Sequence, residues 1–159
     1  MNITLDSTVL IVNDFPKMKR FYTEVLEQKI KHDFGNCIVL EKGLALWQLK
    51  KEYPLSVKLG SVYSKEGNRN IEICYITENI DKAYSDLLKE EVKFLHHIEI
   101  ESWGQKTIRF FDPENNLIEI GESIPCFVRR LYTEGMTMPE VSNKTGIEID
   151  TVNRMINLT

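Results

Sequence analysis

Hydrophobic positions in the first part of the chain follow the order of one strand, one helix and three further strands. Residues 7–13, STVLIVN, form a β-branched apolar run that predicts a strand. Asp14 follows, and the next apolar residues fall on one stripe of a helix. The stripe consists of Phe15, Met18, Phe21, Tyr22, Val25 and Leu26. The predicted strands cover 29–34, 36–41 and 44–49, separated by the turn dipeptides Gly35-Asn36 and Lys42-Gly43.

The same order recurs further along the chain. IEICYI at 71–76 predicts a strand, and Asn79 is the expected N-cap of the helix that follows. The apolar stripe of this helix consists of Ile80, Ala83, Tyr84, Leu87 and Leu88, and strands are predicted near 92–98, 104–111 and 116–121. The pattern therefore predicts a duplicated β-α-β-β-β unit. Within a domain at 1–122, the units cover about 5–63 and 71–122, with a linker near Ser64–Asn70.

Residues 123–159 differ from both units and predict a helical C-terminal extension. Gly135 and Gly146 separate three short amphipathic segments, and Thr137-Met138-Pro139-Glu140 combines an N-cap, an early proline and a capping-box glutamate. The stretch RRLYTEGMTMPEVSNKTGIEIDTVNRMI is similar to a helix-turn-helix. Its candidate recognition helix, about Asp150–Leu158, offers Asn153, Arg154 and Asn157 for contacts with DNA.

The charge of this extension argues against DNA as its partner. Its basic residues Arg129, Arg130, Lys144 and Arg154 are balanced by Glu134, Glu140, Glu148 and Asp150. Phosphate neutralisation requires an excess of positive charge, so we expect the extension to serve packing instead. The apolar residues expected to pack against the sheet or a second subunit are Leu131, Met136, Val141, Val152 and Ile156.

Composition narrows the class of protein further. With 159 residues, 42% hydrophobic and 28% charged, the chain has the composition of an ordinary globular protein. A net charge of −4 also disfavours nucleic acid as a partner of the whole chain. The longest apolar run, Val9–Val12, is too short to cross a bilayer, and we expect a cytoplasmic protein. Cys37, Cys74 and Cys126 are predicted to be reduced and buried.

Three segments together resemble the vicinal oxygen chelate superfamily, which contains glyoxalase I, the bleomycin resistance proteins and the extradiol dioxygenases. VLIVNDFPKMKRFYTEVL at 9–26 is similar to the strand, aspartate turn and aromatic helix of that family. RFFDPENNLIEIGE at 109–122 resembles its DPxGNxIE ending. SWGQKTIRFFDP at 102–113 is similar to a subgroup of uncharacterised glyoxalase-like proteins. The resemblance implies an α+β fold in which two βαβββ units form incomplete-barrel cups.

The resemblance also implies where metal ligands would lie. Metal-using relatives place His, Glu or Gln on the first and last strand of each unit. The corresponding positions here fall on Ser7, Trp47, Ile71 and Glu119. Only Glu119 keeps a metal-ligating side chain, whereas a divalent ion needs three or four donors. We therefore predict no metal site and no cofactor, which argues against glyoxalase I activity and extradiol cleavage.

Several side chains remain candidates for contact with a ligand. Trp47 and Trp103 could line an apolar pocket or simply fill the core or a dimer interface. His96 and His97 point to opposite faces of a strand, so that only one of them, taken to be His96, can face a cup. Alternation from Ile71 turns Tyr75 inward.

Glu119 is the best candidate for a catalytic residue, although no catalytic group is established. In a cup without a metal, its carboxylate needs a cation, and Arg109 on the neighbouring strand is the candidate partner. The alternatives are a structural ion pair and a carboxylate that accepts a ligand's donor groups. No GxGxxG, P-loop, HExxH or GxSxG motif is present.

The function predicted from these observations is metal-independent binding of a small, partly aromatic or amphipathic molecule by a homodimer of the glyoxalase/bleomycin resistance type. The predicted ligand-binding residues are Ser7, Trp47, Tyr75, His96, Trp103, Arg109 and Glu119. One alternative is a lyase or isomerase with Glu119 as general base, with or without a weakly held metal. Another alternative is a ligand sensor whose C-terminal tail contacts DNA.

Overall fold

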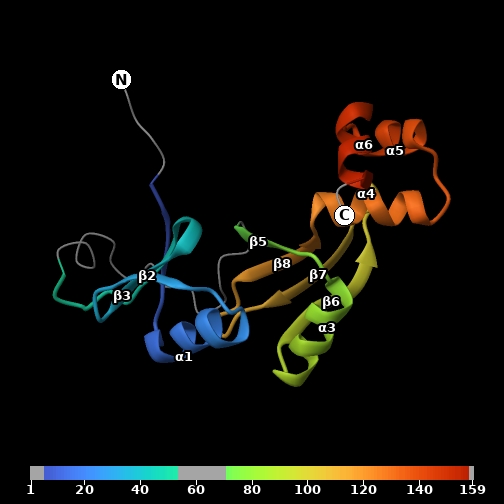
Figure 1. Cartoon of the computed structure of the whole chain (residues 1–159). Coiled ribbons are helices and arrows are strands. Elements are labelled where there is room, and N and C mark those ends of the chain that lie inside the picture. Colours follow the sequence, from blue (N-terminus) through green and yellow to red (C-terminus); the bar gives the residue numbers. More distant parts are fainter. Residues whose placement is uncertain (1–5, 54–70, 158–159) are drawn as a thin grey trace. The chain divides into compact units, whose positions relative to one another are not determined.

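A computed structural model describes residues 6–53 and 71–157, which form two compact units (Figure 1). Unit 1 contains the chain up to Asn70 together with the short segment Asp112–Asn116. Unit 2 contains Ile71–Phe111 and Leu117–Thr159. Each unit is built on an open, mixed, four-stranded sheet, which agrees with the predicted α+β class. The predicted linker at Ser64–Asn70 lies outside the described residues.

Unit 1 follows the predicted order of one strand, one helix and three strands. Its elements are β1 (Thr8–Ile11), α1 (Phe15–Arg20), a π-helical turn η1 (Phe21–Val25), β2 (Ile30–Asp33), β3 (Cys37–Leu40), a 3-10 turn η2 (Glu41–Gly43) and β4 (Leu44–Trp47). The Asp14 side chain caps α1 by accepting the Lys17 backbone N–H at 3.1 Å. The sheet order is β1-β4-β3-β2, with β1 parallel to β4. Met18, Tyr22, Ile38 and Leu46 are fully buried in its core.

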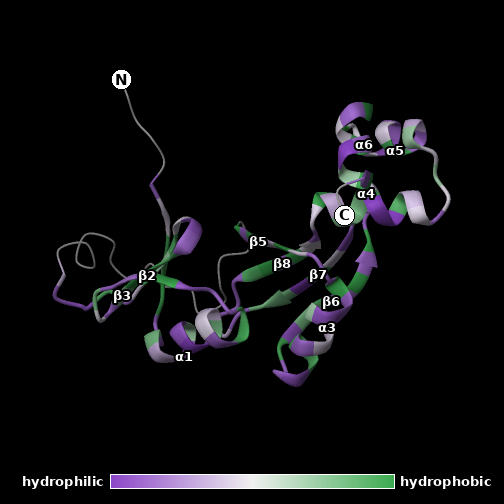
Figure 2. Ribbon diagram, viewed as in Figure 1, coloured by the Kyte–Doolittle hydropathy of each residue, from purple (hydrophilic) through white to green (hydrophobic). Residues whose placement is uncertain are grey.

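Unit 2 repeats this topology. Its elements are β5 (Glu72–Thr77), α3 (Ile80–Lys89), β6 (Lys93–Ile100), β7 (Lys106–Phe111) and β8 (Leu117–Glu122), in the sheet order β5-β8-β7-β6. Asn79 caps α3 by accepting the Lys82 backbone N–H at 2.9 Å, as its position predicted. Hydrophobic residues dominate β8, whereas α3 carries hydrophobic and hydrophilic stripes (Figure 2). The Tyr84 ring contacts Phe94, which in turn contacts Phe110, so that α3 covers this face of the sheet.

The segment Asp112–Asn116 turns the chain and also binds distant residues of unit 1. Asn115 has φ 64°, a left-handed conformation that asparagine tolerates. The buried Asp112 carboxylate also accepts the Tyr22 hydroxyl at 3.0 Å. Glu114 accepts the backbone N–H groups of Asn13 and Asp14 at 2.8 and 2.7 Å. These distant contacts fix the start of α1, which explains why the segment belongs to unit 1.

Three helices complete unit 2: α4 (Ile124–Thr133), α5 (Met138–Thr145) and α6 (Ile149–Asn157). Glu140 accepts the Thr137 backbone N–H at 2.7 Å, and Gly146 ends α5 with φ 70°, as the capping signals predicted. The expectation that their apolar residues pack on the sheet or on a second subunit is wrong. Short amphipathic helices joined by tight turns can bury their faces on one another, and here they do so. The shared core contains Phe127, Val128, Leu131, Val141 and Val152.

The three cysteines are free, as predicted, but they are not buried. Cys37 and Cys126 are half-buried, and Cys74 is exposed. Cys74 differs from the prediction because it lies on the polar face of the second sheet, opposite Glu119 in the strand register. Among the described helices, none combines the length and the apolar character needed to cross a bilayer.

Replacing Asp112 with alanine should lower the free energy of unfolding by about 2–3 kcal/mol, because the buried Tyr22 hydroxyl and the half-buried Asn116 amide would lose the carboxylate that accepts from them. Urea denaturation followed by circular dichroism measures the change. Asp33→Ala is the matched control, since Asp33 also accepts a turn N–H, from Gly35 at 2.9 Å, but is exposed. Equal losses in the two variants would contradict a special role of the Asp112 contacts.

Candidate functional site

The face of the second sheet that α3 leaves uncovered carries a cluster of charged side chains. Strand register sets these side chains side by side, because Glu119 pairs with Arg109 and Arg109 pairs with His96. A register shift between Phe94 and His96 interrupts the regular alternation of β6. Phe94 therefore faces α3, whereas His96 faces Arg109.

Arg109 lies at the centre of this group, which we call the Arg109 cluster and define as Glu72, His96, Glu101, Arg109 and Glu119. Its Nε donates to Glu72 Oε1 at 2.6 Å. Nη1 donates to Glu101, and Nη2 donates to Glu119. Glu101 also accepts the Thr107 hydroxyl at 2.8 Å. The planar guanidinium thus presents its N–H groups to carboxylates from β5, β8 and the turn after β6.

His96 completes the cluster as a hydrogen-bond partner of Arg109. Its Nδ1 lies 2.7 Å from the His97 carbonyl oxygen, which can only accept, so Nδ1 carries the proton. Its Nε2 then accepts from Arg109 Nη1 at 3.2 Å. His97 points to the other face, where its Nδ1 lies 3.0 Å from the Tyr84 hydroxyl. The prediction that the two histidines face opposite ways is confirmed.

The charges of the cluster do not balance. The carboxylates of Glu72, Glu101 and Glu119 face one guanidinium. Burial raises the pKa of Glu119, with the nearby charges of Glu72 and Glu101 adding to the effect against the attraction of Arg109. The hydrogen bond from Arg109 lowers the pKa of Glu101. Burial alone would lower the pKa of Arg109, but its hydrogen bonds to Glu101 and Glu72 raise it overall.

These residues do not form a metal site of the kind that the resemblance implied. Glu119 binds Arg109, and the other carboxylates converge on the same guanidinium rather than on a common point between them. Across residues 6–53 and 71–157, no group of three or more His, Cys, Asp or Glu side chains is arranged to hold an ion. The positive charge at the centre of this face is therefore supplied by a side chain.

The structure brings together His96, Arg109 and Glu119 among the predicted ligand-binding residues. Tyr75 pairs with Ile120, one position from Glu119, and therefore lies on the opposite face, which contradicts its predicted orientation. Trp103 lies in the turn after β6 and is 48% exposed, with its Nε1 donating to Gln105 Oε1 at 3.0 Å. Ser7 and Trp47 belong to unit 1.

Ser7 and Trp47 have local partners within unit 1. The Ser7 hydroxyl donates to Asp6 Oδ2 at 3.2 Å. Trp47 ends β4, and its ring centroid lies 6.3 Å from that of Tyr53. Neither contact shows a role in ligand binding, so that both assignments stay predictions.

Sequence reasoning missed Glu72 and Glu101. It placed the family's ligand position on Ile71 and turned Glu72 away from Glu119, an error of one residue that inverts the whole strand. Alignment of the helix N-caps would have corrected it, because Ser7 precedes Asp14 by the same seven residues that separate Glu72 from Asn79. Glu101 carries no such signal, since it lies in a turn.

Comparison with known proteins supports the resemblance. Residues 5–125 match the family described as a glyoxalase-like domain. A protein of unknown function from Agrobacterium tumefaciens is 30% identical, with 78% of this chain and 97% of that chain covered and a TM-score of 0.67. An integron cassette protein from Vibrio cholerae is 28% identical, covering 77% of this chain and 97% of that chain, with a TM-score of 0.56.

More distant structures agree in fold alone. A glyoxalase/bleomycin resistance protein/dioxygenase superfamily member from Sphaerobacter thermophilus is 23% identical, with a TM-score of 0.56 over 77% of this chain and 98% of that chain. No curated protein matches the sequence.

Glu119→Gln should gain stability relative to the wild type as the pH rises above 4.5. In the wild type, the raised pKa of Glu119 means that the folded state holds this proton more tightly than the unfolded state does. That stabilisation is lost as the pH rises from the ordinary value of 4.5 through the higher pKa of the folded state. The variant has no such proton, so that its stability relative to the wild type should increase across this window.

Urea denaturation at several pH values tests this expectation. The exposed Glu148→Gln change is the control and should leave the pH dependence as it is in the wild type. A variant that loses stability relative to the wild type as the pH rises would contradict the prediction, because attraction to Arg109 would then outweigh the cost of burial.

Proposed function

Because the chain belongs to the glyoxalase-like domain family, we propose that the Arg109 cluster binds a small molecule without a metal ion, in the manner of a bleomycin resistance protein. The observation that carries the proposal is the position of the Arg109 guanidinium. Its N–H groups bind the carboxylates that would otherwise be available to a metal ion. Binding would then sequester the ligand, and no bond of the ligand needs to break.

The chemistry of the cluster defines the kind of ligand. A carboxylate has about four lone-pair sites, and Arg109 occupies only a part of those on Glu72, Glu101 and Glu119. The Glu119 side chain is 15% exposed, so its charge is incompletely solvated and gains from a further donor. The cluster therefore suits a cationic ligand with several N–H groups, such as an aromatic amine, amidine or guanidine.

A second candidate function is proton transfer by Glu119 in a lyase or isomerase. The specific observation in its favour is the raised pKa of this carboxyl group, which brings it closer to the pH at which a general base accepts and returns protons. His96, held as the Nδ1–H tautomer, would orient the substrate. Loss of turnover with retained binding in Glu119→Gln would favour this function over simple sequestration.

The homodimer and the cytoplasmic location also stay proposals. Supporting the dimer, apolar residues are exposed on the edge strands, with Val9 and Ile11 on β1 and Ile76, 70% exposed, on β5. A second copy would remove these side chains from water. Sedimentation equilibrium should give twice the chain mass of 18.6 kDa if the proposal is correct, and the chain mass if it is wrong.

Titration with benzamidine tests the ligand class, since this planar aromatic cation presents paired N–H donors. We expect benzamidine to shift the NMR signals of His96 and Arg109, whereas benzoate, of similar shape and opposite charge, should not. Glu119→Gln should weaken benzamidine binding by about tenfold, as for loss of one charge-assisted hydrogen bond. Glu148→Gln should bind as the wild type does. Equal responses to benzamidine and benzoate would contradict recognition by the carboxylates.

Arg109→Ala tests the claim that a side chain takes the place of a metal ion. Removing the guanidinium leaves three carboxylates and a histidine on one face, a donor set suited to Mn²⁺ or Zn²⁺. Either ion should therefore raise the melting temperature of Arg109→Ala but not that of the wild type or Arg109→Lys. Stoichiometric metal in the purified wild type, lost in Glu119→Gln, would overturn metal-independent binding.

A further inference from the structure

The turn between β6 and β7 carries Glu101, one of the carboxylates that bind Arg109. Two backbone hydrogen bonds close this turn: Glu101 N–H donates to the Gln105 carbonyl at 2.9 Å, and Gly104 N–H donates to the Glu101 carbonyl at 2.7 Å. Gly104 has φ 99°, a backbone conformation that residues other than glycine rarely adopt. The position of the Glu101 carboxylate thus depends on the conformation of a short turn.

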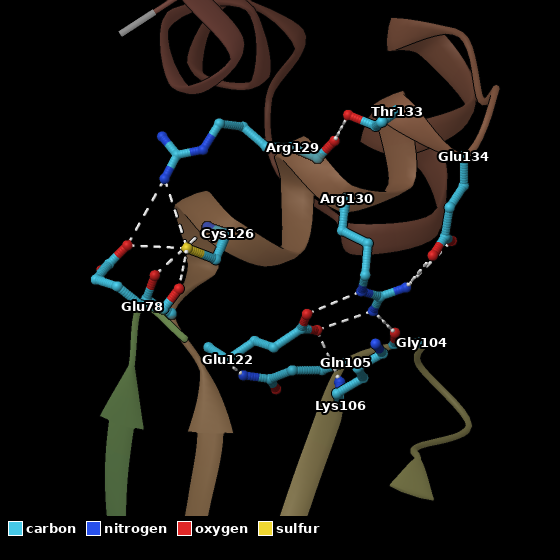
Figure 3. Close-up of polar contacts among 11 residues, drawn as sticks. Glu78, Gly104, Gln105, Lys106, Glu122, Cys126, Arg129, Arg130, Thr133 and Glu134 are labelled. Atoms are coloured by element: carbon cyan, nitrogen blue, oxygen red, sulfur yellow. Dashed lines mark hydrogen bonds and ion pairs between the residues drawn. The ribbon is translucent and has the colours of Figure 1, made fainter. Parts of the chain in front are cut away.

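Arg130 of helix α4 binds this turn directly (Figure 3). Its Nη2 donates to the Gly104 carbonyl oxygen at 2.7 Å. Its Nε and Nη2 also form a bidentate pair with the Glu122 carboxylate, both at 2.8 Å. Such paired bonds fix the guanidinium in orientation as well as in position.

Glu122 extends the same attachment to the other end of the turn. Its Oε2 accepts the Lys106 backbone N–H at 2.9 Å, and its carbonyl oxygen accepts Gln105 Nε2 at 2.6 Å. The Glu122 side chain is only 7% exposed, and the hydrogen bond from Arg130 is the main influence that lowers its pKa against the effect of burial. The Arg130–Glu122 ion pair, in which only Glu122 is buried, therefore binds the turn at Gly104 and at Lys106.

Two further side chains of the helical segment pack against Gly104. A Cβ atom at this position would lie 2.5 Å from Lys144 Cε of α5 and 3.4 Å from Phe127 Cε2 of α4. The Arg130 guanidinium lies 5.6 Å from the centre of the Phe127 ring. The helices thus contact the turn through apolar packing as well as through the ion pair.

We propose that Arg130 is a positioning residue for the Arg109 cluster: by binding the Gly104 carbonyl and Glu122, it holds the turn that places the Glu101 carboxylate against Arg109. The C-terminal helices would then form a part of the site's support rather than an independent appendage. This inference rests on the proposed function only in that the cluster is the ligand-binding site.

Arg129 and Arg130 offer a matched pair of variants on one helix. Arg129 donates to Cys126 Sγ at 3.5 Å and lies 3.6 Å from the Glu78 carboxylate, so it contacts neither Gly104 nor Glu122 in the described interactions (Figure 3). We expect Arg130→Gln to accelerate amide hydrogen exchange of Glu101 and Gly104 by about tenfold, as for loss of a charge-assisted hydrogen bond. The Arg109 Nε–H signal should shift as well. Arg129→Gln should change neither.

The readout separates positioning from general stability. In Arg130→Gln, amides in the middle of α3 should exchange as in the wild type, since only the turn is released. The proposal would be overturned if amide exchange in Arg130→Gln accelerated equally in the turn and in α3. It would also be overturned if the turn amides exchanged at the same rate in Arg130→Gln and Arg129→Gln. If Arg130→Gln does not fold, Arg130→Lys replaces it. A single ammonium cannot bind both Glu122 and the Gly104 carbonyl, so Arg130→Lys should still accelerate amide hydrogen exchange in the turn.

Benzamidine titration distinguishes this inference from the proposed function. Benzamidine affinity should fall several-fold in Arg130→Gln and remain unchanged in Arg129→Gln. If the wild type does not bind benzamidine, the proposed ligand class fails, whereas the exchange rates still confirm or refute the action of Arg130 on the turn.

Discussion

The interaction on which the second unit depends is the set of ion pairs between one guanidinium and three carboxylates on the open face of its sheet. A sheet face lined by Glu72, Glu101 and Glu119 would repel itself if no cation stood among them. Arg109 supplies that cation from the middle of the sheet, on β7, where strand pairing fixes its backbone on both sides. The cation at the centre of this face is therefore a side chain of the protein itself.

Much of the fold follows from local signals in the sequence. The periodic pattern of apolar residues predicts the duplicated βαβββ order, and short-range capping signals predict the cap at Asn79 and the end of α5 at Gly146. The pairing of Arg109 with Glu119 was also predictable, because the two residues lie on adjacent strands of a predicted hairpin. The rest of the site depends on register, and register changes which face a residue occupies.

Three residues show where that dependence defeats sequence reasoning. Glu72 and Tyr75 were assigned to the wrong faces because the start of β5 was placed one residue too early. In β6, register shifts on both sides of His96 break the regular alternation of side chains. The face that Glu101 occupies therefore cannot be predicted by alternation along the strand. The position of Glu101 is determined by Arg130 and Glu122, whose distance along the chain no local pattern encodes.

The assignment of Asp112–Asn116 to the first unit has a consequence for the expression of fragments of the chain. The polypeptide passes from one unit to the other after residues 70, 111 and 116, so the duplicated halves are interlaced rather than joined end to end. A fragment that stops at residue 70 would lack the acceptors for Tyr22 and for the start of α1. A separately expressed half would therefore lack some of the hydrogen bonds that the whole chain forms.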